Sequence, residues 1–271
     1  MQEINGDNKL SVLEKLKYFL INIQKFFYFK KIKLYNTNYK VKKKDNNLLI
    51  NLPSPSRYLQ NYYIKNEINK KISRNKIHVL DVGCGSSEVA ELLEYADFHG
   101  EYTGIDIRNY YDSKLGINSF SKKFIKNDIL KQHFDEKFDL IISNSVMEHI
   151  KQDIIVFQKL QTLLNKNGFQ IHLVPSRFSL FLYLFHGWRQ YSIFDANSKL
   201  DNVEEVIYLG GAFSFFLHLF LLTIPQILFK KDLRKFIPNL YSFLLHKSAN
   251  LDKFLPFFYT TIIFIKNGKN K

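Results

Sequence analysis

The chain has 271 residues, a formal net charge of +14 at pH 7 and a single cysteine, Cys84. One cysteine excludes an internal disulfide and a cysteine-rich metal site. The positive charge is typical of proteins that bind nucleic acid or an anionic membrane. Lys, Asn, Ile, Phe and Tyr are abundant together, however, as A+T-rich coding would produce without selection for charge. Composition alone does not separate these two explanations.

The first fifty residues form a basic segment, and the pattern within residues 9–44 predicts an amphipathic helix. Residues 9–44 contain eleven lysines and one acidic residue. Apolar residues recur at helical spacing in this stretch: Leu10, Leu13, Leu16, Phe19, Leu20, Ile23, Phe26 and Phe27. Such a helix either lies on an anionic bilayer or packs against the domain that follows it. Because the stretch lacks an uninterrupted apolar run with a small-residue cleavage site, we do not expect a signal peptide.

Residues 77–93 predict a strand, a glycine turn and a helix. The strand-forming run at 77–82 leads into Gly83-Cys84-Gly85, and a helix pattern follows at 88–93. Glycine lets the backbone of such a turn approach a ligand closely, and the helix presents its first N–H groups to the same place. By itself the turn is a weak signal, because Ser or Glu occupies the third glycine position of the nucleotide-binding motif.

Four further strands are predicted after this helix. They cover residues 101–107, 123–129, 138–145 and 169–174, and a helix pattern runs from Gln152 to Leu164. Strands that alternate with helices predict right-handed crossovers and a mainly parallel sheet. Ligands bind beyond the carboxyl ends of such strands, where Gly83, Asp106, Asp128 and Asn144 fall.

This succession of motifs over residues 75–176 resembles the class I S-adenosylmethionine-dependent methyltransferases, in the branch of small-molecule enzymes with a D-V-G-C-G first motif. The resemblance implies an α/β fold with a Rossmann-like, doubly wound, mainly parallel seven-stranded sheet and an antiparallel last strand, which we place at 257–265. It implies S-adenosylmethionine as the cofactor. The cofactor-binding residues that it implies are Asp81, Gly83 and Gly85 for the methionine part, Asp106 for the ribose, Asp128 and Ile129 for the adenine amino group, and Asn144 and Ser145 beside the sulfonium.

The resemblance leaves the acceptor open, and we narrow it by exclusion. Residues 143–146 lack the prolines found in relatives that methylate adenine or glutamine amides, and the chain has no Pro-Cys nucleophile for pyrimidine C5. An oxygen or amine acceptor on a small molecule, a sugar or a lipid remains, with O-methylation preferred. His149, beside Glu148, is the candidate general base because an imidazole titrates near neutrality. Its alternative role is packing against the cofactor.

Glu148 and His149 also resemble part of the E-x-x-E-H metal pattern of ubiquinone-type O-methyltransferases. Ser145 replaces the first Glu of that pattern, so we expect no metal. After Pro175 the chain becomes rich in aromatic residues with polar tips, a region that often builds the acceptor pocket in the family. The candidate substrate contacts there are Arg177, His186, Trp188, Arg189 and Tyr191. Arginine suits a phosphate or carboxylate on the acceptor, and the alternative is ordinary packing of a lid.

Residues 206–229 contain no charged side chain and are long enough for a membrane span. A single span would separate the last strand from its sheet, and Gly210-Gly211 and Pro225 are expected to interrupt the helix. A helical lid therefore fits better. It either lies on a membrane, helped by flanking lysines such as Lys230 and Lys231, or is a buried cap.

We divide the chain into a basic amphipathic segment (1–50), a cofactor-binding core (51–175), an apolar helical lid and acceptor region (176–256), and a last strand with a basic tail (257–271). We expect a cytoplasmic enzyme, peripheral at the inner face of the cell membrane, that methylates a small-molecule, glycan or lipid-linked acceptor such as a surface-glycan precursor. Two other functions stay open. One is an RNA methyltransferase, although no RNA-binding module is recognised, and the other is a non-catalytic interaction protein with the same fold. The oligomeric state is not indicated.

Overall fold

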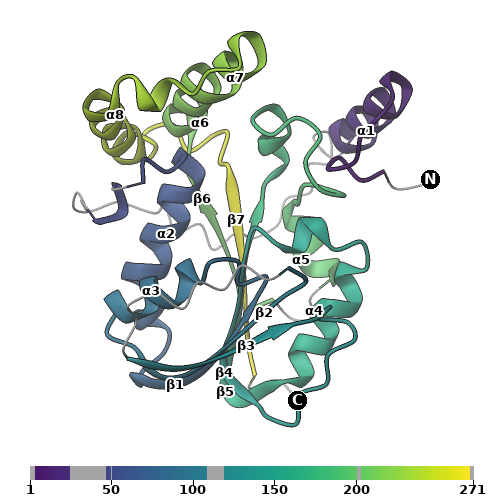
Figure 1. The fold of residues 1–271 in the computed structure, drawn as a ribbon, viewed down its shortest axis with the longest axis vertical. Helices are drawn as coiled ribbons and strands as arrows, with labels where there is room; N and C mark the ends of the chain where they lie inside the picture. Colours follow the sequence, from purple (N-terminus) through teal and green to yellow (C-terminus); the bar gives the residue numbers. More distant parts are fainter. Residues whose placement is uncertain (1–3, 25–46, 50, 109–118, 200–202, 269–271) are drawn as a thin grey trace. The chain divides into compact units, whose positions relative to one another are not determined.

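The computed structural model describes residues 4–24, 47–49, 51–108, 119–199 and 203–268 (Figure 1). Much of the predicted basic segment, including Phe26 and Phe27, lies outside the described residues. The chain divides into two compact units. The first unit comprises Met1–Tyr62, Val174–Ser192 and Ile207–Ile262. The second unit comprises Tyr63–Leu173, Ile193–Val206 and Ile263–Lys271.

A seven-stranded sheet has the order β3-β2-β1-β4-β5-β7-β6. The strands are β1 (Lys76–Val82), β2 (His99–Asp106), β3 (Phe120–Lys126), β4 (Phe138–Asn144), β5 (Leu164–Pro175), β6 (Glu205–Leu209) and β7 (Thr261–Asn267). β1 pairs in parallel with β2 and β4, β2 with β3, and β4 with β5. Every residue of β4 is buried, as expected for a central strand of a parallel sheet.

β7 runs antiparallel to its two neighbours. In the second unit, the amide of Gly268 donates to the carbonyl of Gly168 on the β5 side. The amide of Glu204 donates to the carbonyl of Ile265. In the first unit, the amide of Thr260 bonds to the carbonyl of Leu209. The mainly parallel sheet with an antiparallel last strand is therefore confirmed. This strand begins at Thr261, four residues later than predicted from the sequence.

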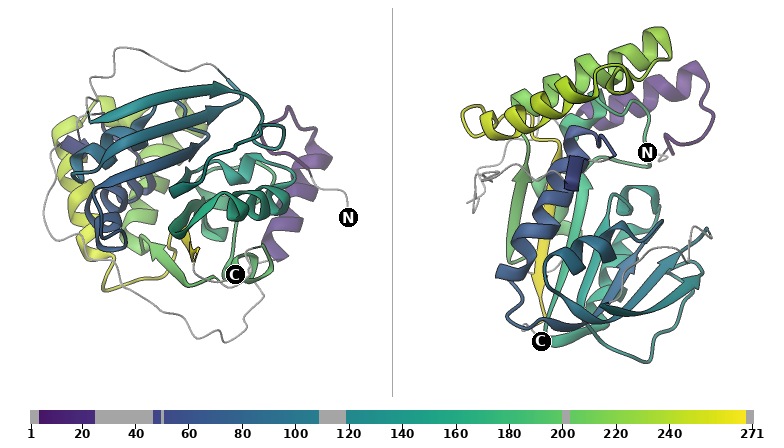
Figure 2. Two further views of the ribbon diagram at one scale, coloured as in Figure 1. Left: turned by 90° about the horizontal axis from the view of Figure 1, so that it is seen from below. Right: turned by 60° about the vertical axis from the view of Figure 1, so that its left-hand side comes forward.

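The second unit carries the helices that cover the parallel strands. Its helical segments are the end of α2 (Pro55–Glu67), η3 (Ile68–Lys70), α3 (Glu88–Tyr95), η4 (Met147–His149), α4 (Asp153–Thr162) and α5 (Ile193–Lys199). α3 buries Val89, Ala90, Leu92 and Leu93, whereas its three glutamates are only half-buried. This is the one-sided apolar pattern from which the helix was predicted. The left-hand view of Figure 2 shows β1, β2 and β3 running side by side in this unit.

The first unit is mostly helical. It contains α1 (Val12–Gln24), η2 (Asn47–Leu49), the start of α2 (Pro55–Glu67), η5 (Arg177–Phe181), α6 (Ala212–His218), η6 (Leu219–Thr223), α7 (Ile224–Phe229), η7 (Leu233–Lys235) and α8 (Pro238–Leu251). α1 packs against η5, and α6 packs against α8. Tyr18 and Asn22 are buried on the inner side of α1, whereas Leu13, Leu16 and Leu20 are exposed.

Gly210-Gly211 interrupt the apolar stretch as predicted, since β6 ends at Leu209 and the helix begins at Ala212, whereas the predicted interruption at Pro225 is wrong. Among the described residues, Ala212–Phe229 is one helix long and apolar enough, by length and composition, to cross a membrane. Gly211 precedes this helix as its N-cap. The helix continues through Pro225 because a π turn, η6, comes directly before it. A π turn changes the local hydrogen-bond pattern, which accommodates the missing proline N–H and the bulk of its ring.

Candidate active site

The glycine turn after β1 places its two glycines in different surroundings. Both have positive φ, +72° at Gly83 and +48° at Gly85, a conformation that L side chains rarely adopt. A Cβ atom added at Gly83 would lie 2.3 Å from Cγ2 of Val146, so the loop after β4 packs directly against this position. A Cβ atom at Gly85 would meet no described atom within 4 Å. Gly83 is therefore needed for packing, and Gly85 borders open space.

Asp106 is tied to the glycine turn. Its Oδ2 accepts a hydrogen bond from the amide of Gly85 at 3.1 Å, and its Oδ1 accepts one from the amide of Arg108 at 2.9 Å. The turn is also held to β2 by the amide of Gly83, which donates to the carbonyl of Ile105 at 2.7 Å. An ionised carboxylate has about four lone-pair sites, so Asp106 keeps capacity to accept from ribose hydroxyls.

Asp81 lies within β1 and is almost completely buried. It accepts a hydrogen bond of 2.5 Å from the hydroxyl of Tyr102. Burial raises the pKa of Asp81 to about 7, and the bond from Tyr102 acts in the opposite direction. The contribution of Asp81 to binding the methionine part stays a prediction. Sequence reasoning missed Tyr102, since no local pattern links a tyrosine on β2 to a carboxylate on β1.

Cys84, between the two glycines, packs beside Gly104. A Cβ atom at Gly104 would lie 2.8 Å from the Cys84 sulfur. Burial raises the pKa of the Cys84 thiol, with Asp81 and Asp106 adding to the effect. A thiol with a raised pKa is a poor nucleophile. These surroundings support the sequence interpretation of Cys84 as a packing residue.

Asp128 and Ile129 follow the end of β3. The strand stops at Lys126, so Asp128 lies in a turn and not within the strand predicted over 123–129. The reason is local, because Oδ1 of Asp128 accepts from the amide of Leu130 at 2.9 Å and its carbonyl accepts from the amide of Lys131. Asp128 thus caps this turn, and Ile129 is buried beside it. Their contact with an adenine amino group stays a prediction.

Asn144 carries the clearest sign of a missing partner at the carboxyl edge. It is the last residue of β4, and its buried side-chain Nδ2 and Oδ1 make no hydrogen bond with any residue that the structure describes. A buried amide without partners costs free energy, which a bound polar ligand would recover. Ser145 follows with φ +58°, and its amide donates to the carbonyl of Leu173 at 2.9 Å. This bond fixes the direction in which the chain leaves the strand.

Glu148 and His149 lie on the short helix η4 that follows. Glu148 is buried, whereas His149 is exposed. Oε1 of Glu148 lies 3.9 Å from Nε2 of His149, and the amide of His149 donates to the carbonyl of Val146 at 2.9 Å. Of the two side chains, only that of His149 is open to a group outside the protein.

The predicted substrate contacts lie in the first unit. Arg177 opens η5, and its guanidinium lies 5.2 Å from the ring centroid of Phe178. Partial burial raises the pKa of the half-buried Tyr208 and Tyr259 phenols, and the positive charge of Arg177 acts in the opposite direction. Arg189 and Tyr191 are buried, and Trp188 is half-buried. The backbone of Tyr191 pairs with Pro175 and Arg177, so this loop runs beside the end of β5.

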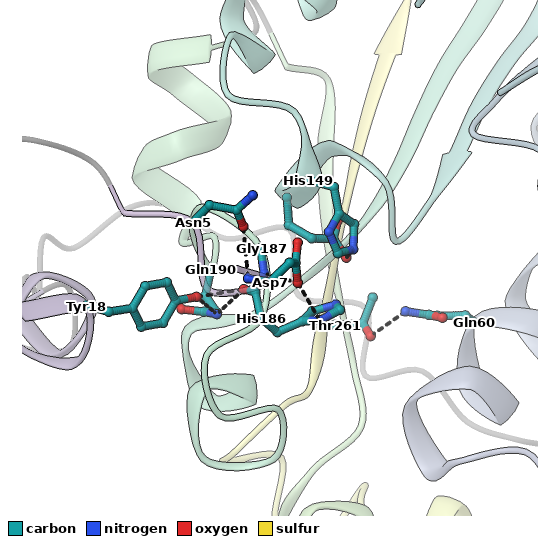
Figure 3. Close-up of polar contacts among 10 residues, drawn as sticks. Asn5, Asp7, Tyr18, Gln60, His149, His186, Gly187, Gln190 and Thr261 are labelled. Carbon is teal, nitrogen blue, oxygen red and sulfur yellow. Dashed lines mark hydrogen bonds and ion pairs between the residues drawn. The ribbon is translucent and has the colours of Figure 1, made fainter. Parts of the chain in front are cut away.

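His186 is held by the N-terminal residues of the same unit (Figure 3). Its Nδ1 lies 3.4 Å from Oδ1 of Asp7, and the same oxygen accepts from the amide of Gly187 at 2.9 Å. The hydroxyl of Tyr18 donates to the carbonyl of His186 at 2.6 Å, and the side-chain Nε2 of Gln190 donates to that hydroxyl at 2.9 Å. We call this set of contacts the N-terminal latch. The described part of the N-terminal helix thus packs within its own unit, and its contact with a bilayer stays a prediction.

The second unit thus brings together part of the predicted cofactor site. The glycine turn is bonded to Asp106 and packed against Val146, whose neighbours are Asn144, Ser145, Glu148 and His149. Asp81 lies beneath the turn, and Asp128 lies at the end of the next strand. These positions are the carboxyl ends of β1, β2, β3 and β4, where ligands of parallel α/β sheets bind.

Comparisons with known proteins agree with this arrangement. A family model described as a methyltransferase domain matches residues 56–204, more than half of the chain. The chain is 30% identical over 117 residues to the ubiquinone biosynthesis O-methyltransferase of Glaesserella parasuis serovar 5 (strain SH0165), covering 39% of this chain and 47% of the relative. It is 28% identical over 143 residues to the release factor glutamine methyltransferase of Buchnera aphidicola subsp. Schizaphis graminum (strain Sg), covering 46% and 51%. The chain spans about half the length of these curated relatives.

A solved structure supports the fold over a greater length. The plantazolicin methyltransferase BpumL in complex with SAH aligns with a TM-score of 0.52 at 15% identity, over 82% of this chain and 88% of that protein. At this identity the likeness shows the fold alone.

Proposed function

The chain belongs to the methyltransferase domain family, and on that basis we propose that it transfers a methyl group from S-adenosylmethionine to an oxygen atom of a small-molecule acceptor. The observation that carries this proposal is the unpartnered, buried amide of Asn144 beside the glycine turn and Asp106. It lies at the edge of the sheet where the cofactor of this family is expected.

The residues at this edge fit S-adenosylmethionine. Gly85 borders open space, Asp106 keeps acceptor capacity, and Asn144 has both a donor and an acceptor to offer. Gly83 and Gly85 would hold the methionine part, Asp106 the ribose, and Asn144 with Ser145 the region of the sulfonium. When bound, the cofactor supplies an electrophilic methyl group to a nucleophilic atom of the acceptor.

We assign the role of general base to His149. A hydroxyl acceptor must lose its proton as its oxygen is methylated, and a base within hydrogen-bond reach accelerates that step. His149 is exposed and lies on the loop that begins at Asn144. The buried carboxylate of Glu148, 3.9 Å away, would stabilise the imidazolium that results. This pairing supports O-methylation over methylation of an amine that is already nucleophilic.

We propose that the acceptor is a small molecule, either a glycan or a lipid-linked compound. The enzyme would methylate it at the inner face of the cell membrane. The apolar helices of the first unit support a hydrophobic acceptor. Arg177, set among Phe178, Tyr208 and Tyr259, suits a phosphate or carboxylate group on that acceptor. His186, Trp188, Arg189 and Tyr191 are proposed as further contacts on the same loop.

Transfer of a labelled methyl group tests this function. The protein is incubated with methyl-labelled S-adenosylmethionine and with lipid and glycan extracts, and the labelled product is isolated. We expect His149→Ala to lower the transfer rate by about a hundredfold or more, the usual contribution of a general base. Binding of S-adenosylhomocysteine should be retained in that variant.

The matched control is His99→Ala, which removes an exposed histidine at the start of β2 in the same unit. It should leave the rate unchanged. A wild-type rate in His149→Ala would remove His149 from the chemistry. Labelling of protein or nucleic acid instead of a small molecule would contradict the proposed acceptor class.

A further inference from the structure

Helices α6, α7 and α8 of the first unit expose apolar side chains, which is unusual for surface helices of a water-soluble protein. α8 points Leu240, Phe243 and Leu251 outward at helical spacing, and Phe236 and Phe254 flank the helix with 68% and 66% of their surface exposed. Its inner side buries Tyr241, Leu245, Ser248 and Ala249. A surface helix in water normally shows charged and polar residues on its outer side. The outer side of α8 is instead mainly apolar.

The continuous helix of α6, η6 and α7 repeats this pattern. Its exposed apolar residues are Phe213, Phe216, Phe220, Ile227, Leu228 and Phe229. Phe216 and Phe220 stack on each other with their centroids 6.0 Å apart, and Phe220 is 58% exposed. α6 packs against α8, and both figures of the fold draw α6, α7 and α8 as neighbours (Figures 1 and 2). We call the exposed apolar residues of α6–α8 and their flanks the apolar helical face.

The charges around the apolar helical face are almost all positive. Residues 212–257, all of which the structure describes, contain six basic and two acidic residues. Asp232 is held by Arg234 in a two-bond pair, with both N···O distances 2.9 Å. Asp252 is buried, where it accepts from the amide of Ser214 at 2.9 Å. Neither carboxylate offsets the lysines at the surface.

These lysines stand beside the exposed rings. Nζ of Lys247 lies 5.6 Å from the ring centroid of Phe243, and Nζ of Lys253 lies 4.8 Å from that of Phe254. An aromatic ring next to an ammonium group suits the boundary of an anionic bilayer, where the ring enters the acyl region and the ammonium meets lipid phosphates. The core of a protein interface, in contrast, is depleted of lysine.

We propose that the apolar helical face is a docking surface for an anionic lipid bilayer, with α6–α7 and α8 lying on the membrane rather than crossing it. The inner side of α6–α7 is fixed to the protein. Ser214 bonds to Asp252, the ring of His218 lies 4.8 Å from that of Tyr183, and the hydroxyl of Thr223 donates to the carbonyl of Leu182 at 2.9 Å. A transmembrane helix would break these contacts. The proposal deepens the proposed function, and rests on it only in placing the enzyme where a lipid-linked acceptor would be found.

Vesicle flotation of the full-length protein tests the docking surface. The vesicles are phosphatidylcholine alone, or phosphatidylcholine with about a third phosphatidylglycerol, and no cofactor or acceptor is needed. We expect binding to the anionic vesicles and little to the neutral ones, because basic residues near an anionic surface contribute about fivefold each in affinity, corresponding to roughly 1 kcal/mol. Equal binding to both would overturn the charge argument, and binding to neither would overturn the proposal.

Two variants locate the surface. Phe236→Ser/Phe243→Ser/Phe254→Ser removes exposed rings, and Lys247→Glu/Lys253→Glu reverses charge; each should weaken anionic-vesicle binding about tenfold or more. The matched controls are Ile154→Ser/Ile155→Ser on α4 and Lys76→Glu/Lys166→Glu, all at exposed positions of the second unit. They should bind vesicles like the wild type.

Folding and function are read separately from docking. Circular dichroism and S-adenosylhomocysteine binding establish that each variant is folded. Wild-type vesicle binding by both test variants would overturn the proposal even if the protein is a methyltransferase. Self-association in ultracentrifugation that is lost in the phenylalanine variant would assign the face to a second copy of the chain instead. Vesicle binding without any methyl transfer would leave docking intact and count against the proposed function alone.

Discussion

The hydroxyl of Tyr102 on β2 donates a 2.5 Å hydrogen bond to the buried carboxylate of Asp81 on β1, directly beneath the glycine turn. Burial raises the pKa of Asp81 to about 7 from an ordinary value of 3.8. The native state therefore binds a proton between these two pH values that the unfolded chain has released. By linkage, the contribution of Asp81 to stability falls as pH rises from about 4 to about 7 and is constant above this window.

The first prediction is that replacing Asp81 changes how the stability of the protein depends on pH. Asp81→Asn removes the titrating group and keeps the size of the side chain. The free energy of unfolding of the variant should therefore rise relative to that of the wild type as pH rises from 4 to 8. The full difference is of order 4 kcal/mol, from about three pH units at 1.36 kcal/mol each. Urea unfolding of both proteins at several pH values measures it. A difference that does not change with pH would show that Asp81 has an ordinary pKa.

The second prediction concerns the partner of Asp81. Tyr102→Phe keeps the ring and removes the donor, leaving a buried carboxylate with one hydrogen bond fewer. We expect a loss of about 1–3 kcal/mol in unfolding free energy at pH 8, where Asp81 is ionised. The loss should be smaller at pH 5, because the protonated carboxyl needs the donor less. An equal loss at both pH values would contradict a role of the hydroxyl toward the charged form.

The third prediction separates packing from ligand contact in the glycine turn. Gly83→Ala should cost about 1–3 kcal/mol through overpacking against Val146, in addition to the strain of a positive φ. Gly85→Ala should cost only about 1 kcal/mol, yet weaken S-adenosylhomocysteine binding, because its Cβ points into open space. Thermal unfolding and calorimetry measure the two effects.

A double variant checks the assignment at Gly83. Val146→Ala removes the two γ carbons that a Cβ at Gly83 would meet at 2.3 and 2.5 Å. Gly83→Ala/Val146→Ala should therefore be more stable than the sum of the single changes predicts. Simple additivity would show that the cost of Gly83→Ala comes from the backbone alone.

The fourth prediction concerns the N-terminal latch. Tyr18→Phe removes the hydroxyl that donates to the His186 carbonyl and accepts from Gln190. We expect a loss of about 1 kcal/mol and faster hydrogen exchange in residues 4–24, with S-adenosylhomocysteine binding unchanged. Tyr95→Phe, at an exposed tyrosine on α3, is the control. Unchanged exchange in Tyr18→Phe would mean that the apolar contacts of α1 alone hold the segment.

The sequence predicted the second unit better than the first, and the reason is physical. The central strands β1 and β4 are short, mostly apolar runs, and residues predicted for the site, such as Gly83, Asp106 and Asn144, lie at or just after the ends of strands. The pattern that predicts a strand therefore also predicts the position of these residues. The end of β3 was placed too late, because a turn capped by Asp128 has no signal distinct from a strand end.

Other features depend on contacts between residues far apart in the sequence. The bond between Tyr102 and Asp81 arises from the pairing of β1 with β2, and the latch joins Tyr18 to a loop near residue 186. The passage of the helix through Pro225 depends on a π turn that propensity rules do not anticipate. Which side of the apolar helix is exposed likewise depended on tertiary packing, because the stretch is apolar on nearly every side.

The central claim is a cofactor site at the carboxyl edge of the sheet, and calorimetric titration of S-adenosylhomocysteine tests it most directly. The wild type should bind with a dissociation constant around micromolar, equivalent to about −8 kcal/mol. Asp106→Ala should lose at least tenfold in affinity, while Asp135→Ala, at an exposed carboxylate between β3 and β4, should bind like the wild type. A folded wild type that does not bind, or equal binding by Asp106→Ala, would contradict the site.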